Sequence, residues 1–64
     1  MSAKFFTVVE PITLNGEATM VIRHICLTLA EAQKKASPIF ALNKDVLIHE
    51  VSAERKPIEH EVEL

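Results

Sequence analysis

An Asn15-Gly16 pair separates two stretches rich in β-branched and aromatic residues, and this arrangement limits the possible folds more than any other feature. Asn-Gly is the strongest short-range signal for a two-residue hairpin turn, because both residues tolerate positive φ angles. Residues 4–10 (KFFTVVE) predict a strand that bends at Pro11. Residues 18–27 predict a second strand. We therefore expect the chain to begin with an antiparallel β-hairpin.

A helix is predicted directly after this hairpin. Thr28 and Glu31 have the spacing of a capping box, in which each side chain accepts a hydrogen bond from the backbone N–H of the other. The stretch LAEAQKKA consists of strong helix formers. Pro38 has no backbone N–H, so we expect the helix to end or kink near Ser37, with a further helical turn up to Leu42.

The remainder of the chain predicts one or two more strands. Residues 46–51 (VLIHEV) are typical of a third strand. In residues 58–64 (IEHEVEL), glutamates alternate with the other side chains, which indicates either a fourth strand or an acidic tail. The expected fold is a single α+β domain of residues 1–64, with residues 55–64 as strand or tail. A three- to four-stranded antiparallel or mixed sheet would carry one helix on one face, in the order ββαβ with an optional C-terminal strand.

The size of the chain favours association with another subunit. A domain near 60 residues buries only about 60% of its unfolded surface, so its stability is marginal. Cys26 is the one cysteine among 64 residues, which excludes an internal disulfide. We therefore expect a homodimer or a complex with another protein.

The location and the class of partner are constrained as well. A lone thiol is typical of a reducing compartment. No apolar run approaches the roughly 20 residues of a membrane span, and the first residues lack the apolar core of a signal peptide. A cytoplasmic protein without membrane contact is expected. The net charge is −2, the basic residues are scattered, and three phenylalanines are the only aromatic residues, which argues against direct nucleic-acid binding.

Catalysis and metal binding find little support in the sequence. His24 and Cys26 are two residues apart on a predicted strand, so with His49 they are the weak candidates for a metal site. Structural zinc sites use Cys and His pairs at short, repeated spacings, which this chain lacks. Ile25 and Leu27 predict burial of the thiol, which raises its pKa instead of activating it. We expect no enzyme activity and no cofactor.

Two groups of residues are candidates for partner binding. The first is an acidic row near the C-terminus, which either solubilises the chain or attracts a basic surface on a partner: Glu50, Glu54, Glu59, Glu61 and Glu63. The second is the adjacent pair Phe5 and Phe6, whose side chains must face opposite sides of a strand.

The phenylalanine pair predicts a sheet that is apolar on both sides. One of the two rings is expected under the helix, and the other is expected on the outer face with Val21, Ile25, Leu47 and Val51. Such a sheet needs cover on both faces, and one helix supplies only one cover. The second cover would come from a partner or a second copy. A one-residue error in the predicted register would remove this argument.

The succession of KFFTVVE, a hairpin, LTLAEAQKKA and VLIHEV resembles the layout of small phage-encoded host-takeover proteins, of the type that inhibits bacterial RNA polymerase. The resemblance covers most of the chain at the level of pattern, without a diagnostic motif. It implies a phage- or prophage-encoded inhibitor of a host protein and assigns no functional residue. The sequence therefore favours a small non-enzymatic protein-binding modulator. The alternatives are a structural homo-oligomer or accessory subunit and, third, a small metal-binding module.

Overall fold

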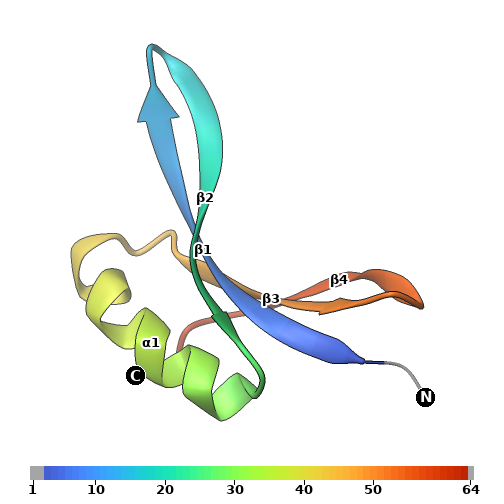
Figure 1. The fold of residues 1–64 in the computed structure, drawn as a ribbon. Coiled ribbons are helices and arrows are strands. Elements are labelled where there is room, and N and C mark those ends of the chain that lie inside the picture. The colour runs from blue at the N-terminus through green and yellow to red at the C-terminus, as the bar shows by residue number, and fades with distance from the viewer. Residues whose placement is uncertain (1–2, 64) are drawn as a thin grey trace.

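The computed structural model describes residues 3–63, which form four strands and one helix in the order ββαββ (Figure 1). The elements are β1 (Lys4–Leu14), β2 (Glu17–Cys26), α1 (Leu29–Leu42), β3 (Leu47–Ser52) and β4 (Arg55–His60). The strands lie in the order β2-β1-β3-β4, and each neighbouring pair is antiparallel. This confirms the predicted α+β fold with its one helix and shows that the fourth strand is present.

The first two strands form the predicted hairpin around Asn15 and Gly16, whose φ angles are 52° and 82°. β1 continues through Pro11 without ending there. Proline is tolerated because β3 pairs with β1 only as far as Val9, so the missing N–H interrupts no ladder on that side. Beyond this point the hairpin projects away from the helix, and we call residues 10–21 the hairpin arm (Figure 1). The molecule is correspondingly elongated, with extents of 41 × 25 × 15 Å.

A β-bulge interrupts the pairing of β1 with β2. Val8 pairs with His24 and Val9 pairs with Ile22, which leaves Arg23 as an extra residue in β2. An extra residue changes which side chains of a strand share a face. Ile22 therefore takes the place on the outer face that the sequence predicted for Val21, and the prediction for Val21 is wrong.

The helix begins at the predicted cap and reaches Leu42 as predicted, but as one continuous element. Thr28 is the N-cap, and its Oγ1 accepts a hydrogen bond from the Glu31 backbone N–H at 3.1 Å. The expected break near Ser37 does not occur, since α1 continues to Leu42 with Pro38 inside it. Pro38 is exposed, so water can solvate the carbonyl that loses its usual donor.

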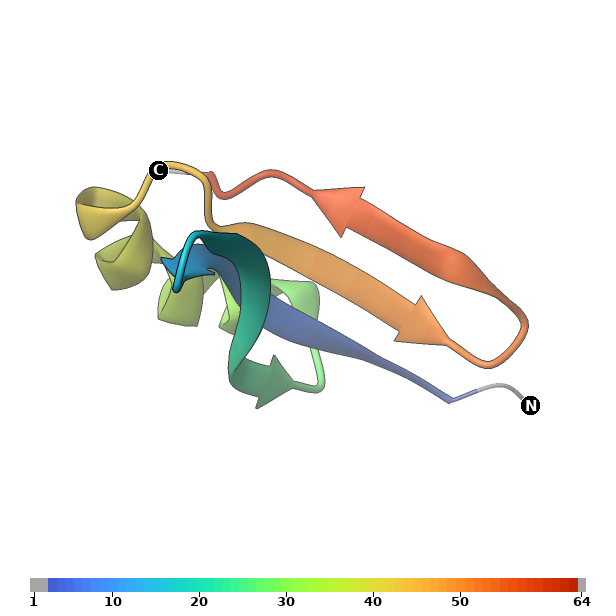
Figure 2. The same ribbon diagram turned by 90° about the horizontal axis from the view of Figure 1, so that it is seen from above.

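The hydrophobic core lies between α1 and one face of the sheet. Ala32 and Ala36 are fully buried in α1, and their small side chains allow the helix to approach the strands closely. The buried core residues are Phe6, Val8, Cys26, Ala32, Ala36, Val46 and Ile48. Figure 2 shows the helix running along one side of the strands.

The C-terminal segment forms the fourth strand, earlier in the chain than the alternation predicted, and the residues after it are held on the helix and do not form a free tail. β4 ends at His60, and residues 61–63 then lie along the helix. Gln33 holds them, because its Nε2 donates to the Glu61 carbonyl at 2.9 Å and its Oε1 accepts from the Glu63 N–H at 2.7 Å. Val62 packs against the core. Leu64 lies outside the described residues. Between residues 3 and 63, no helix has the length and apolar character that a membrane span requires.

Candidate binding surface

The sheet face opposite α1 carries no secondary-structure element of the described chain (Figures 1 and 2). Cross-strand partners point to the same side of a sheet, so the register defines the residues of this face. Phe5 pairs with Val51, Thr7 pairs with both Ile25 and His49, and Val9 pairs with both Ile22 and Leu47. Met20 follows by alternation from Ile22. We call this surface the open face: Phe5, Thr7, Val9, Met20, Ile22, Ile25, Leu47, His49 and Val51.

The open face is apolar and solvent-exposed at its margins. In the central strand β1, Thr7 and Val9 are each only 5% exposed, because neighbouring strands flank them. The side chains around them are open to solvent: Phe5 is 37% exposed, Met20 50%, Ile22 59% and Ile25 67%. Soluble monomers rarely leave such side chains together on one surface, and a contiguous apolar patch of this kind usually marks an interaction site.

His49, on the β4 side of the open face, forms a pair with Glu59. The Nε2 atom of His49 lies 3.5 Å from Oε2 of Glu59, its cross-strand partner in β4. This Nε2 atom is buried and makes no hydrogen bond in the described part of the chain. The apolar centre of the face therefore has a polar margin on the β4 side, a distribution that is typical of protein interfaces.

The predicted acidic row is divided between different parts of the molecule. Glu50 lies on the helix side of the sheet, where its carboxylate is 3.1 Å from His60 Nε2 and 3.9 Å from Lys4 Nζ. Glu59 is on the opposite side, next to His49. Glu54 lies in the β3–β4 turn, and Glu61 and Glu63 lie in the tail along α1. The five glutamates do not form one strip.

Phe5 and Phe6 divide between the two faces as predicted. Phe6 belongs to the core and is 4% exposed, and its ring centroid lies 6.2 Å from that of His60. Phe5 is on the open face. Of the seven residues that the sequence suggested for partner binding, Phe5 and Glu59 are the two that the structure places on or beside this surface.

The weak metal candidates do not come together. His24 and Cys26 lie on the helix side of β2, but Cys26 is 2% exposed whereas His24 is exposed. His49 lies on the open face, on the other side of the sheet. Residues 3–63 contain no group of three His, Cys, Asp or Glu side chains suited to a metal ion. Burial raises the pKa of the Cys26 thiol above its usual value, and the nearby Glu31 carboxylate adds to this effect.

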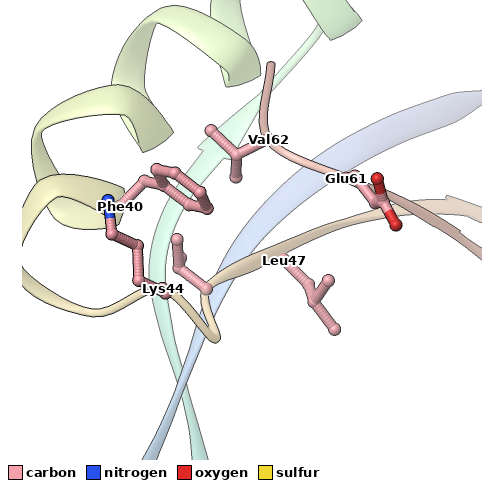
Figure 3. A pocket seen from close by; sticks show the side chains of 6 residues that line it. Phe40, Lys44, Leu47, Glu61 and Val62 are labelled. Atoms are coloured by element: carbon pink, nitrogen blue, oxygen red, sulfur yellow. The ribbon is translucent and has the colours of Figure 1, made fainter. Parts of the chain in front are cut away.

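A small hollow lies at the C-terminal end of α1 and encloses about 190 Å³. Phe40, Lys44 and Val62 surround it, and Lys44 Nζ lies 4.6 Å from the centroid of the Phe40 ring (Figure 3). The Glu61 carboxylate points away from the phenylalanine ring (Figure 3). Pockets for small molecules usually measure about 300–1,000 Å³ and have several converging polar groups. This hollow is below that range, so the open face is the stronger candidate site.

A polar cluster at the base of the hairpin arm was missed by the sequence analysis. Asn43, the C-cap residue of α1, donates from Nδ2 to Glu10 Oε2 and to the Pro11 carbonyl, each at 3.1 Å. Its Oδ1 accepts from the Asp45 N–H at 3.0 Å. Arg23, the bulge residue, lies 3.5 Å from the Glu10 carboxylate. An asparagine after a helix is a recognisable stop signal, but its partners in β1 are about 30 residues away in sequence and carry no local signature.

Comparisons with known protein families, with curated proteins and with solved structures find no match for this chain.

Proposed function

We propose that this chain is a small non-catalytic protein that modulates another protein by binding it through the open face. The observation that carries the proposal is the exposure of Phe5, Ile22 and Ile25 on a sheet surface that the helix does not cover. Fully burying an exposed side chain of this type contributes about 1.5–3 kcal/mol, and a partner would gain the part of this that corresponds to the surface still exposed on each of these three residues.

The resemblance of the strand and helix order to small phage-encoded host-takeover proteins supports a more specific version. In that version the partner is a bacterial host protein, and binding inhibits it. The apolar centre and polar margin of the open face suit a partner surface of the same character. Glu59 and His49 at the margin would contribute to the orientation of the complex.

The experiment compares matched baits in a bacterial lysate. Phe5→Ser and Ile25→Ser remove apolar groups from the open face, while Leu42→Ser makes the same kind of change at the end of α1, where Leu42 is 92% exposed. We expect the wild type and Leu42→Ser to retain the same dominant protein, and the two open-face variants to lose it. If all four baits recover that protein equally, the open face is not the binding surface and the proposal fails.

A structural or accessory subunit assembled from copies of this chain is the second candidate function. The observation that favours it is the long outer edge of β2, which has ten residues and no neighbouring strand among residues 3–63. Sedimentation of the pure protein separates the candidates, since a strict monomer excludes the second and leaves the first intact.

A further inference from the structure

The two edge strands of this sheet, β2 and β4, differ in how well they resist pairing with a further strand. Unpaired strands are usually blocked by proline, lysine or a short length. β4 is six residues long and carries Lys56 and Pro57, and the free side of β1 in the hairpin arm carries Pro11. β2 is ten residues long and contains neither proline nor lysine. Its bulge at Arg23 lies near the far end, so the stretch from Glu17 to Ile22 remains regular.

The hairpin geometry identifies the free backbone groups on β2. A two-residue turn places its flanking residues, Leu14 and Glu17, in a hydrogen-bonded pair. Hydrogen-bonded and non-hydrogen-bonded pairs then alternate along the antiparallel ladder. Ala18, Met20 and Ile22 therefore direct their N–H and C=O groups away from β1, toward solvent. Pro11 pairs with Met20, and this assignment also agrees with the absence of an N–H on Pro11.

We propose that two copies of this chain pair through β2, antiparallel and centred on Met20. In this register Met20 lies opposite Met20 of the second copy, and Ala18 lies opposite Ile22. The free backbone groups of both edges then meet each other. These three side chains share the open-face side of β2, so the junction also buries apolar surface.

Charge complementarity selects this register. With Met20 on the two-fold axis, Glu17 lies opposite Arg23 of the second copy on the helix side of the sheet, and the symmetry repeats the pair. The free backbone groups can also meet when one copy is shifted by two residues along the other. Such a shift places Glu17 opposite Val21 or Ile25 of the second copy, and both ion pairs are lost. Glu17 forms no ion pair within its own chain among residues 3–63, while Arg23 is half exposed beside Glu10. Glu17 is therefore available, and Arg23, which already pairs with Glu10, keeps about half of its side chain exposed for a second carboxylate.

This pairing is independent of the proposed partner. A two-fold axis perpendicular to the sheet keeps the open faces of both copies on the same side. The dimer would present one continuous apolar surface, larger than that of either copy. Edge pairing can thus succeed or fail without deciding whether the open face binds a host protein.

Cysteine crosslinking tests the register. Met20→Cys places two thiols opposite each other across the axis, at a Cα separation of about 5.5 Å, which a disulfide spans. Ala18→Cys is the matched control, because its two copies would be four residues out of register, or about 14 Å along the strands. The native Cys26 is buried and should not react. Mild oxidation should convert most of Met20→Cys to a covalent dimer and leave Ala18→Cys and the wild type unlinked.

Charge reversal provides a second measurement on protein with an intact fold, checked by circular dichroism. Glu17→Lys should weaken the dimer about tenfold in sedimentation equilibrium, because two symmetric ion pairs become repulsive. Combining Glu17→Lys with Arg23→Glu should restore most of the affinity. Three results would overturn the pairing: a wild type that stays monomeric at several hundred micromolar, equal crosslinking of both cysteine variants, or no response of the dimer to Glu17→Lys. If β2 instead pairs with an extended peptide of another protein, the pure wild type would stay monomeric, which is the first of these results.

Discussion

Phe5 and Phe6 are neighbours in sequence, and the sheet separates them: Phe6 is 4% exposed beneath α1, while Phe5 is 37% exposed on the open face. Successive side chains of a strand point to opposite sides, so a sheet with a phenylalanine on each side has two apolar faces. The helix covers one of them. No element of the part of the chain that the structure describes covers the other face.

The two phenylalanines lead to different expected losses of stability. Phe6→Ala removes a core side chain and should lower the free energy of unfolding by about 3–5 kcal/mol. Phe5→Ser removes a side chain that is 37% exposed and otherwise packed on the sheet, so it should cost about 1–2 kcal/mol in the monomer, less than Phe6→Ala. Urea denaturation monitored by circular dichroism measures both values. Because Phe6→Ala can leave the protein unfolded, Phe6→Leu serves as a milder substitution with a smaller loss in the same direction. Equal losses for Phe5 and Phe6 would mean that Phe5 belongs to the core.

The N-cap of α1 gives a second prediction. Thr28→Ala removes the acceptor of the Glu31 N–H and should lower the free energy of unfolding by about 1 kcal/mol. Thr28→Ser keeps a hydroxyl in the same place and should remain within a few tenths of a kcal/mol of the wild type. Chemical denaturation of the three proteins gives the comparison. A Thr28→Ser variant as unstable as Thr28→Ala would exclude the capping hydrogen bond as the cause.

Asn43, at the base of the hairpin arm, gives a third prediction. Asn43→Ala removes hydrogen bonds to Glu10, to the Pro11 carbonyl and to the Asp45 N–H, and should cost about 2 kcal/mol. Because two of these bonds attach the arm to α1, amide hydrogen exchange in residues 10–21 should accelerate. Gln33→Ala is the control, since it also removes two hydrogen bonds but at the C-terminal tail. Acceleration of the arm in both variants would contradict a specific role of Asn43.

The buried thiol predicts a pH dependence with a defined sign. Burial raises the pKa of Cys26 above its usual value of 9.0, so the unfolded chain loses this proton at a lower pH than the folded chain. The contribution of Cys26 to stability is therefore complete below pH 9 and declines as the pH rises toward the folded-state pKa. The slope approaches about 1.4 kcal/mol per pH unit at most. Urea denaturation between pH 7 and pH 10.5 should show this decline in the wild type relative to Cys26→Ala. Parallel curves for the two proteins would contradict it.

The features that sequence reasoning recovered are those with local causes. The Asn15-Gly16 turn, the Thr28–Glu31 cap and the alternation of Phe5 with Phe6 each depend on residues within a few positions of one another. These local rules were sufficient for the strand and helix order and for the presence of an uncovered apolar face.

The features that it missed depend on contacts between distant segments. The bulge at Arg23 changes which residues of β2 share a face. No glycine or other characteristic residue near Arg23 in the sequence indicates a bulge there. The acidic row was predicted from proximity in sequence, yet the pairing of Glu50 with His60 and Lys4 places it away from Glu59. Pro38 was expected to interrupt the helix, but at an exposed position its missing hydrogen bond can be replaced by water.

Methyl-group NMR of the labelled protein, titrated with the protein that the wild-type bait retains, tests the binding surface most directly. We predict that the signals of Ile22, Ile25 and Val51 on the open face shift or broaden on binding. The signals of Ile39 and Leu42 in α1 should stay unchanged. Perturbation confined to α1, with the open-face methyl groups unaffected, would contradict the central claim that the uncovered side of the sheet binds the partner.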